Sequence, residues 1–470
     1  MSELLDRLAV DPQAFATMRY DAGFAVPASE QAGVQLGAIA MRFETLKARI
    51  PALARIAAEQ GVERIAALDD VVPLLFPHTV YKSYPLSFLE QGRFDRLTRW
   101  LSALTTVDLG GVDLAGVETI DEWIAALECG SALAPIHTFG TSGKLSILPR
   151  TRDHLRITAT INANCLRDFN GSGAGPDLLA EHKPLIAPSY RHGASAIARG
   201  MNLMADLYGG GEALFLYPDA YFSADVASLA GRLRAAEQRG EAGQLDLPPA
   251  LIARRAEFAA REASRGADMD RFFAAAQARF GGRDVFLFAV WPILFEWAEE
   301  GLRRGIRGVF GANSLLTSGG GTKGKPLPAD YRETIFEFLG FDRHLEFFGM
   351  SELMANAPRC AAGNYHFPPV VVPFVLDADS GEALPREGRQ TGRLALMDLL
   401  PDSYWGGFVT GDRVTMAGFD EPCACGRHGP HIEPDIVRFS DLANGDDKIN
   451  CAGAPEAHDR AVDFLLERTA

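Results

Sequence analysis

The sequence lacks the features that define several large classes of protein. No apolar run is long enough to span a bilayer, because the most apolar stretch, 285–297, contains Pro292 and is followed by Glu299 and Glu300. Residues 1–6 do not combine a basic segment with an apolar one, so they do not predict a secretory signal. We therefore expect a cytoplasmic protein without a membrane span.

Positive charge and cysteine are also scarce. The chain has 46 Lys and Arg against 61 Asp and Glu, a formal net charge of −15, so we do not expect nucleic acid as a partner. Six cysteines in a cytosolic chain of 470 residues favour free thiols, metal ligands or a catalytic residue over a disulfide framework. No internal repeat is visible, and the composition is typical of a globular protein with two or three domains.

Periodic apolar residues predict helices early in the chain and mixed structure after it. Leu36, Ile39, Phe43 and Leu46 recur at three- and four-residue steps, and Pro51 interrupts the pattern. Later segments alternate between strand-like and helix-like patterns, which predicts an α/β protein. The expected parts are a mainly helical N-terminal part over 1–110, an α/β core over 111–441 and a short C-terminal tail over 442–470.

The glycine- and hydroxyl-rich stretch 137–144 is a candidate phosphate-binding loop. Its glycines let backbone N–H groups turn toward an anion, its hydroxyls add donors, and Lys144 adds a positive charge. It is not a Walker loop, because its glycines are only three residues apart and a strand is expected after it. A turn without function is the alternative for such a stretch alone. The candidate phosphate ligands are Thr138, Gly140, Thr141, Ser142, Gly143 and Lys144.

Glycines and carboxylates also follow three later segments that resemble buried strands. Three glycines after Ser318 suit the close approach of backbone to a flat or anionic ligand. The apolar segment 344–348 breaks at Gly349, and Glu352 follows as a candidate metal carboxylate. Asp412 lies beside a glycine in the expected strand 408–415, a common arrangement for binding ribose hydroxyls.

A polar stretch after the short apolar segment 184–188 is a candidate substrate-binding loop. Ligands of open α/β sheets bind outside the carboxyl ends of strands, where Tyr190, His192 and Gly193 would then lie. A structural or exposed histidine is the alternative for His192.

The order of these elements resembles that of the adenylate-forming superfamily of acyl-CoA synthetases, adenylation domains and firefly-type luciferases. Cys423-Ala424-Cys425-Gly426-Arg427 is closer to the phenylacetate–CoA ligase branch, and the short C-terminus is similar to that of acyl-protein synthetases. The elements that carry the resemblance are 138–144, 318–321, 348–352, 410–412 and 438–441.

The resemblance implies an α/β adenylate-forming large domain of layered helices and sheets. It also implies an AMP-forming acid–thiol ligase that converts a carboxylic acid and ATP to an acyl-adenylate, with Mg²⁺ as cofactor and coenzyme A as the expected acceptor. Under this resemblance Lys144 and the hydroxyls of 138–142 would hold phosphates, Glu352 would hold Mg²⁺ and Asp412 the ribose, with Arg438 assisting. Phe348 and the backbone of Gly319, Gly320 and Gly321 would flank adenine, and the other expected cofactor-binding residues are Ser318, Gly349, Met350 and Ser351.

The sequence departs from the family pattern at several positions. Phe139 replaces a hydroxyl residue of the phosphate loop, and Phe348 replaces the commoner tyrosine. In the family, a small domain with a catalytic lysine follows the segment that matches 438–441; here only residues 442–470 follow, so we expect that domain to be missing or reduced to a short tail. Either Lys448, the last lysine, replaces the family lysine, or a partner protein supplies the group, or the lysine is dispensed with.

Two pairs of Cys and His residues predict a structural zinc site. Cys360 and His366 form one pair and Cys423 and Cys425 the other, a common layout for a tetrahedral site, and some phenylacetate–CoA ligase relatives carry similar residues. Buried thiols unrelated to His366 are the alternative. Four protein ligands would leave no open position for catalysis.

Two other functions remain open at this stage. Acyl-protein synthetases pass a fatty acyl group to a cysteine near their own C-terminus, which makes Cys451 a candidate acceptor, although a small buried cysteine is the alternative. A non-catalytic nucleotide- or partner-binding protein on the same fold is the other. The acid itself is not identified by the sequence.

Overall fold

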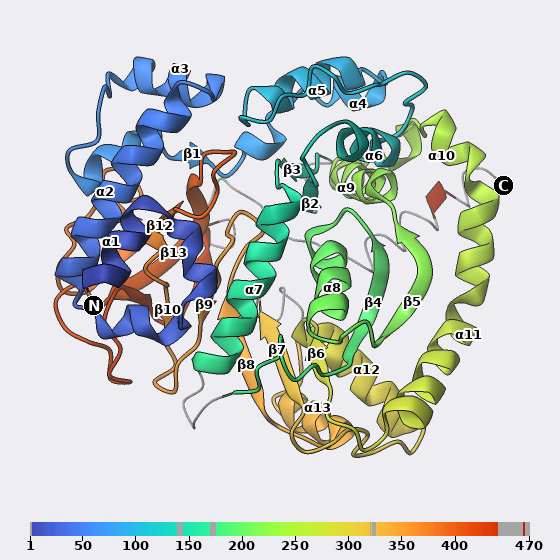
Figure 1. Ribbon diagram of the computed structural model, residues 1–470. Helices are drawn as coiled ribbons and strands as arrows, with labels where there is room; N and C mark the ends of the chain where they lie inside the picture. Colours follow the sequence, from blue (N-terminus) through green and yellow to red (C-terminus); the bar gives the residue numbers. More distant parts are fainter. Residues whose placement is uncertain are drawn as a thin grey trace.

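The computed structural model describes residues 2–138, 144–169, 175–319, 321, 326–439, 464 and 465. Over these residues the chain forms the expected α/β fold, with a largely parallel sheet, an antiparallel sheet and a short hairpin (Figure 1). No helix among them is long and apolar enough to cross a membrane.

Helices dominate the first part of the chain. The predicted amphipathic segment lies in α2 (Ala28–Lys47), whose Ile39, Phe43 and Leu46 are buried, and Pro51 begins α3 (Pro51–Gln60), where its missing N–H costs nothing. The other helices here are α1 (Ser2–Val10), α4 (Ser87–Glu90), α5 (Phe94–Ser102) and α6 (Ile120–Gly130), with 3₁₀ turns over Pro12–Thr17, Tyr20–Ala25, Leu68–Leu74 and Val80–Lys82.

The parallel sheet has the strand order β5-β4-β6-β7-β8-β9 in the described part of the chain, and only the short β9 runs antiparallel. Helices cross between its strands and pack against it (Figure 1). Its strands are β4 (Leu185–Gly193), β5 (Ala213–Phe222), β6 (Phe286–Phe288), β7 (Leu315–Gly319), β8 (His344–Phe348) and β9 (Ala357–Pro358). The helices of this part are α8 (Ala196–Leu207), α9 (Ala224–Gln238), α10 (Pro249–Ala253), α11 (Arg255–Phe280), α12 (Trp291–Arg303) and α13 (Tyr331–Leu339), with a 3₁₀ turn over Ala242–Gln244.

The second sheet is mainly antiparallel and joins distant parts of the chain. Its strand order is β10-β14-β13-β12-β11, and β1 and β15 also pair with β13. Because β1 comes from the first part of the chain, this pairing attaches the N-terminal helices to the later residues. Its strands are β1 (Phe76–Pro77), β10 (Tyr365–His366), β11 (Val371–Leu376), β12 (Gln390–Asp398), β13 (Gly407–Ala417), β14 (His431–Ile432) and β15 (Val437–Arg438).

One helix and one hairpin connect the two sheets. The strands β2 (Ile136–Thr138) and β3 (Ser146–Leu148) flank the candidate phosphate loop and pair antiparallel, as the sequence predicted for a turn between two strands. Helix α7 (Arg152–Asp168) follows, capped by the Thr151 hydroxyl, and lies between the two halves of the molecule (Figure 1). Its C-terminal half packs on both sides, so it forms a wall of the space between them.

Candidate functional site

A cavity of about 400 Å³ lies between the two sheets, next to α7. It is at the carboxyl ends of β6, β7 and β8, where ligands of parallel sheets bind, and the turn after β8 and the edge of β13 complete it. Nine of the residues predicted from the sequence line it: Thr138, Ser318, Gly319, Gly349, Met350, Ser351, Glu352, Asp412 and Arg438.

Arg150 supports the turn that carries Glu352. Its Nη2 donates to the carbonyl oxygens of Ser351 (2.7 Å) and Leu353 (2.8 Å), and its guanidinium lies over the ring of Tyr404. The residue is only 2% exposed, and its Nη1 has no hydrogen-bond partner among the described residues. A buried guanidinium with a free N–H group beside a cavity can bind an anion there.

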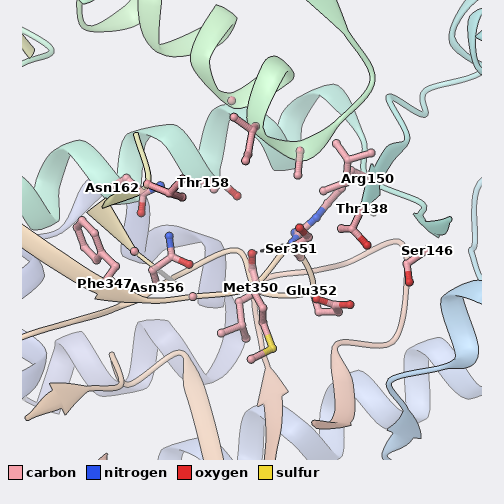
Figure 2. A pocket seen from close by; sticks show the side chains of 18 of the residues that line it. Thr138, Ser146, Arg150, Thr158, Asn162, Phe347, Met350, Ser351, Glu352 and Asn356 are labelled. Atoms are coloured by element: carbon pink, nitrogen blue, oxygen red, sulfur yellow. Dashed lines mark hydrogen bonds between the residues drawn. The ribbon is translucent and has the colours of Figure 1, made fainter. Parts of the chain in front are cut away.

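Glu352 lies in a pocket of mixed charge. Burial raises the pKa of its carboxyl, as does nearby Asp412, while Arg150 and Lys82 act in the opposite direction. Figure 2 shows Glu352 beside Ser351 and Arg150, with Thr138 and Ser146 on the same side of the cavity. One carboxylate beside hydroxyl groups fits Mg²⁺, which binds few protein ligands and takes others from phosphates and water.

Strand pairing brings Asp412 and Arg438 together. The two residues are opposite each other in the β13–β15 ladder, with Arg438 Nε 3.7 Å from Asp412 Oδ1, and both line the cavity. Asp412 is 9% exposed. A carboxylate held in this way on a strand can accept hydrogen bonds from two neighbouring hydroxyls, such as those of a ribose.

Several predicted residues do not line the cavity. Phe348 packs near Tyr365 and Phe367, and its neighbour Phe347 lines the cavity instead, because successive side chains of β8 point to opposite faces. Lys144 Nζ lies 5.9 Å from the ring centre of Tyr84. Gly321 is not a lining residue either.

The loop predicted over residues 189–193 is wrong. The strand β4 does not end at Pro188 but continues to Gly193, which pairs with Phe222 of β5. Tyr190 is therefore buried against the ring of Tyr217, and His192 is exposed; neither lines the cavity, and neither does Gly193.

Some predicted residues lie outside the part of the chain that the structure describes. They are Gly140, Thr141, Ser142, Gly143, Gly320, Lys448 and Cys451.

Sequence reasoning missed other residues of the cavity. His78 and Lys82 come from the first part of the chain, where the sequence analysis named no candidate site residue, and they reach the cavity because β1 pairs with β13. Single polar residues in a helical region give no pattern that could have marked them. The remaining polar side chains that were missed are Ser146, Arg150, Thr158, Asn162, Asn356 and Thr410.

The four predicted zinc ligands lie together, away from the cavity. The ligand atoms of Cys360, His366, Cys423 and Cys425 all lie within 4.8 Å of one another, and none of these residues lines the cavity. Cys425 Sγ is 3.4 Å from His366 Nε2, and the Asn364 amide donates to Cys423 Sγ at 3.3 Å. Three thiols and one imidazole, mostly buried, fit a closed tetrahedral zinc site.

Comparisons with known proteins support the fold. No family model matches the sequence, and the search of curated proteins gives no match. Among solved structures, the chain is similar to an open conformation of 2-hydroxyisobutyryl-CoA ligase in complex with 2-HIB-AMP and CoA, at 15% identity and a TM-score of 0.50 over 91% of this chain and 80% of that one. The same ligase in its thioesterification state, also with 2-HIB-AMP and CoA, gives 13% identity and a TM-score of 0.50 over 90% and 72%.

The ATP-bound MatB of Rhodopseudomonas palustris is less similar, at 16% identity and a TM-score of 0.36 over 68% of this chain and 53% of that one. At these identities the comparison establishes the architecture and not the reaction. The chain has the fold of the adenylate-forming enzymes, as the order of its sequence elements predicted.

Proposed function

We propose that this protein is an AMP-forming acid–thiol ligase, which activates a carboxylic acid with ATP and transfers the acyl group to coenzyme A. The observation that supports this most is the meeting of Thr138, Glu352, Asp412 and Arg438, from distant parts of the chain, at one cavity with the buried Arg150. The similar ligase was solved with an acyl-adenylate and CoA, which is consistent with the proposal.

Each residue has a role that follows from its chemistry. The hydroxyl of Thr138 and the free N–H of Arg150 bind the phosphates, and Asp412 accepts hydrogen bonds from the ribose. Glu352 holds Mg²⁺, which when bound offsets negative charge on the phosphates. The acid's carboxylate attacks the α-phosphorus, the bond to pyrophosphate breaks, and an acyl-adenylate forms.

Positive charge at the cavity stabilises this step. Lys82, Arg150 and Arg438 all line it, and charge accumulates on the phosphate oxygens in the transition state. In the second half of the reaction a thiolate attacks the activated carbonyl carbon and AMP leaves. Coenzyme A is the thiol we propose as acceptor.

We also propose that Cys360, His366, Cys423 and Cys425 bind a structural zinc ion. The cluster ties the β9–β10 region to the loop between β13 and β14, so its role is to stabilise the sheet that carries Asp412. With four protein ligands such a site has no position left for a substrate.

The decisive experiment is ATP–pyrophosphate exchange with a panel of carboxylic acids, followed by mass spectrometry of the CoA thioester. We expect exchange that depends on an acid and Mg²⁺ and that is reduced at least about 100-fold in Glu352→Gln. Glu59→Gln, an exposed position on α3, is the matched control and should leave the rate unchanged.

Two outcomes would contradict the proposal. ATP binding without exchange for any acid would favour a binding protein on this fold. Exchange without a CoA thioester, together with an acyl group that stays on the protein after denaturation, would favour transfer to a protein thiol such as Cys451.

A further inference from the structure

The cavity has a charged end and an uncharged end. Its ionisable lining residues gather around Glu352, whose carboxyl interacts electrostatically with Arg150, Lys82 and Asp412. The wall formed by α7, α8 and the end of β6 with the residues after it contributes no ionisable side chain. This wall consists of Leu155, Thr158, Ala159, Asn162, Ala196, Ile197, Gly200, Met201, Leu203, Met204, Phe288, Ala289 and Val290.

If the protein has the function proposed above, these two ends have different ligands. The phosphates and the reacting carboxylate need the charged end, so the rest of the acid extends toward the uncharged wall. The whole cavity measures about 400 Å³, near the lower limit for a site that holds one drug-sized ligand. Because the nucleotide occupies part of this volume, the space left within the cavity suits a small acid better than a long alkyl chain.

Three polar side chains interrupt the uncharged end. Thr158 and Asn162 are four residues apart on α7, so they share one face of the helix, and Asn356 lies across the cavity from them, near Phe347 (Figure 2). Among the described residues none of the three side chains has a hydrogen-bond partner, although all three are half-buried. One hydroxyl and two amides are thus available to a ligand.

We infer that the substrate is a compact carboxylic acid with a hydroxyl or another hydrogen-bonding group at the end away from its carboxylate. This inference rests on the proposed function. An unsubstituted alkyl chain at this end would cover Thr158, Asn162 and Asn356 without offering them a partner, which costs free energy for each group. A polar substituent satisfies them, while Phe347 and Phe288 supply apolar contact to the body of the acid.

The test compares acids that differ only in the polar group. The pairs are 4-hydroxyphenylacetate with phenylacetate and 3-hydroxybutyrate with butyrate, and hexadecanoate represents long fatty acids. ATP–pyrophosphate exchange gives kcat/KM for each acid, and isothermal titration measures their binding without turnover. We expect the wild type to prefer the hydroxylated member of at least one pair by about 10-fold or more, because a site built for a hydroxyl rejects an analogue without it.

Variants whose new side chains are similar in size to the original ones test whether the uncharged wall causes the preference for hydroxylated acids. Asn162→Leu and Thr158→Val should remove the preference and keep the binding of the unsubstituted acid, whereas Thr160→Val, on the same helix but not at the cavity, should leave it intact. Selective binding without exchange would support this inference while contradicting the proposed ligase activity. Equal or better use of the unsubstituted acids, a preference for hexadecanoate, or binding of none of these acids would overturn it.

Discussion

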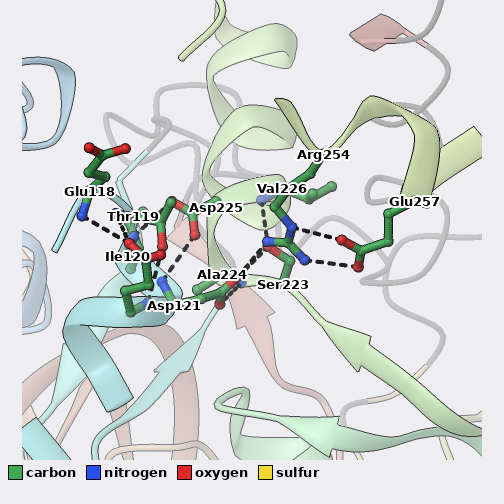
Figure 3. A network of polar contacts seen from close by, with 11 residues as sticks. Glu118, Thr119, Ile120, Asp121, Ser223, Ala224, Asp225, Val226, Arg254 and Glu257 are labelled. Atoms are coloured by element: carbon green, nitrogen blue, oxygen red, sulfur yellow. Dashed lines mark hydrogen bonds and ion pairs between the residues drawn. The ribbon is translucent and has the colours of Figure 1, made fainter. Parts of the chain in front are cut away.

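Asp121 and Asp225 lie in the first turns of two different helices, and the carboxylate of each caps the helix of the other (Figure 3). Asp225 accepts the backbone N–H groups of Ile120 (2.8 Å) and Asp121 (3.0 Å) at the start of α6, and Asp121 accepts that of Ala224 (2.7 Å) at the start of α9. These hydrogen bonds join α6, one of the N-terminal helices, to α9, which follows β5 of the parallel sheet. Arg254 also contributes, because its Nη1 lies 3.4 Å from the Asp121 carboxylate.

The first prediction concerns the pH dependence of stability. Burial, and secondarily the charge of Asp121, raise the pKa of Asp225 to about 7. The folded state therefore holds this proton more tightly than the unfolded state, and the resulting stabilisation is complete below about pH 4 and is lost as the pH rises through about 7. The side chain of the Asp225→Asn variant cannot titrate. The free energy of unfolding of this variant minus that of the wild type should therefore increase between pH 5 and 7, by up to about 1.4 kcal/mol per pH unit.

Chemical denaturation at pH 5, 6, 7 and 8 measures this difference. Asp113→Asn, at an exposed turn, is the control whose pH profile should run parallel to that of the wild type. A parallel profile for Asp225→Asn as well would show that Asp225 does not titrate as described.

The second prediction concerns Arg150. Arg150→Lys keeps a positive charge but cannot hold the Ser351 and Leu353 carbonyls in the same fork, so we expect kcat/KM for ATP in the exchange assay to fall by about 10- to 100-fold. For Arg150→Met, kcat/KM should fall further, and the variant should lose about 1–3 kcal/mol of stability because the carbonyls of Ser351 and Leu353 lose their donor. Arg156→Met, exposed on α7, serves as the control. Similar kinetics for Arg150→Lys and the wild type would mean that charge alone suffices.

The third prediction concerns the turn after β8. A Cβ at Gly349 would lie 2.2 Å from Asn356 Oδ1, so Gly349→Ala must displace the Asn356 side chain or the turn before Glu352. We expect reduced exchange activity in Gly349→Ala and partial recovery in the double variant with Asn356→Ala. Gly37→Ala, where a Cβ meets nothing within 4 Å and the residue lies in α2, should keep full activity. Failure of Asn356→Ala to restore any activity would locate the damage in the backbone instead.

The fourth prediction concerns the thiol cluster. The purified protein should contain one zinc ion per chain by plasma mass spectrometry, and Cys423→Ser should lose most of it. A strong chelator should lower the melting temperature, because the ion binds only the folded cluster. Cys129→Ser, an exposed position outside the cluster, is the control. A full complement of zinc in Cys423→Ser would contradict this ligand set.

Some of the candidate site could be predicted from the sequence because its residues lie within or directly after short strands that the sequence marks. Ser318, Gly349 and Asp412 belong to local patterns, and the parallel pairing of β7 with β8 brings the first two together, whereas Asp412 comes from β13 of the other sheet. The fold could also be predicted, because these patterns follow one another along the chain in the same order as in the enzymes that the sequence resembles.

Other parts depend on information that no local pattern contains. The sequence cannot show whether Phe347 or Phe348 faces the cavity, because this depends on which face of β8 each position occupies, and the two adjacent side chains are identical. The stretch 189–193 is polar yet remains in β4, because its hydrogen bonds to β5 extend beyond the apolar segment. Lys82 and Asn162 reach the cavity only through tertiary packing.

The parallel pairing of β1 with β13 has a consequence for ligand binding. The His78 N–H donates to the Val409 carbonyl at 3.1 Å, only three residues before Asp412, and Lys82 follows one turn later. The pairing thus fixes the position of Lys82 relative to Asp412, whose carboxylate we propose binds the ribose. The same strand pairing that joins the first part of the chain to the second sheet therefore also places positive charge at the cavity.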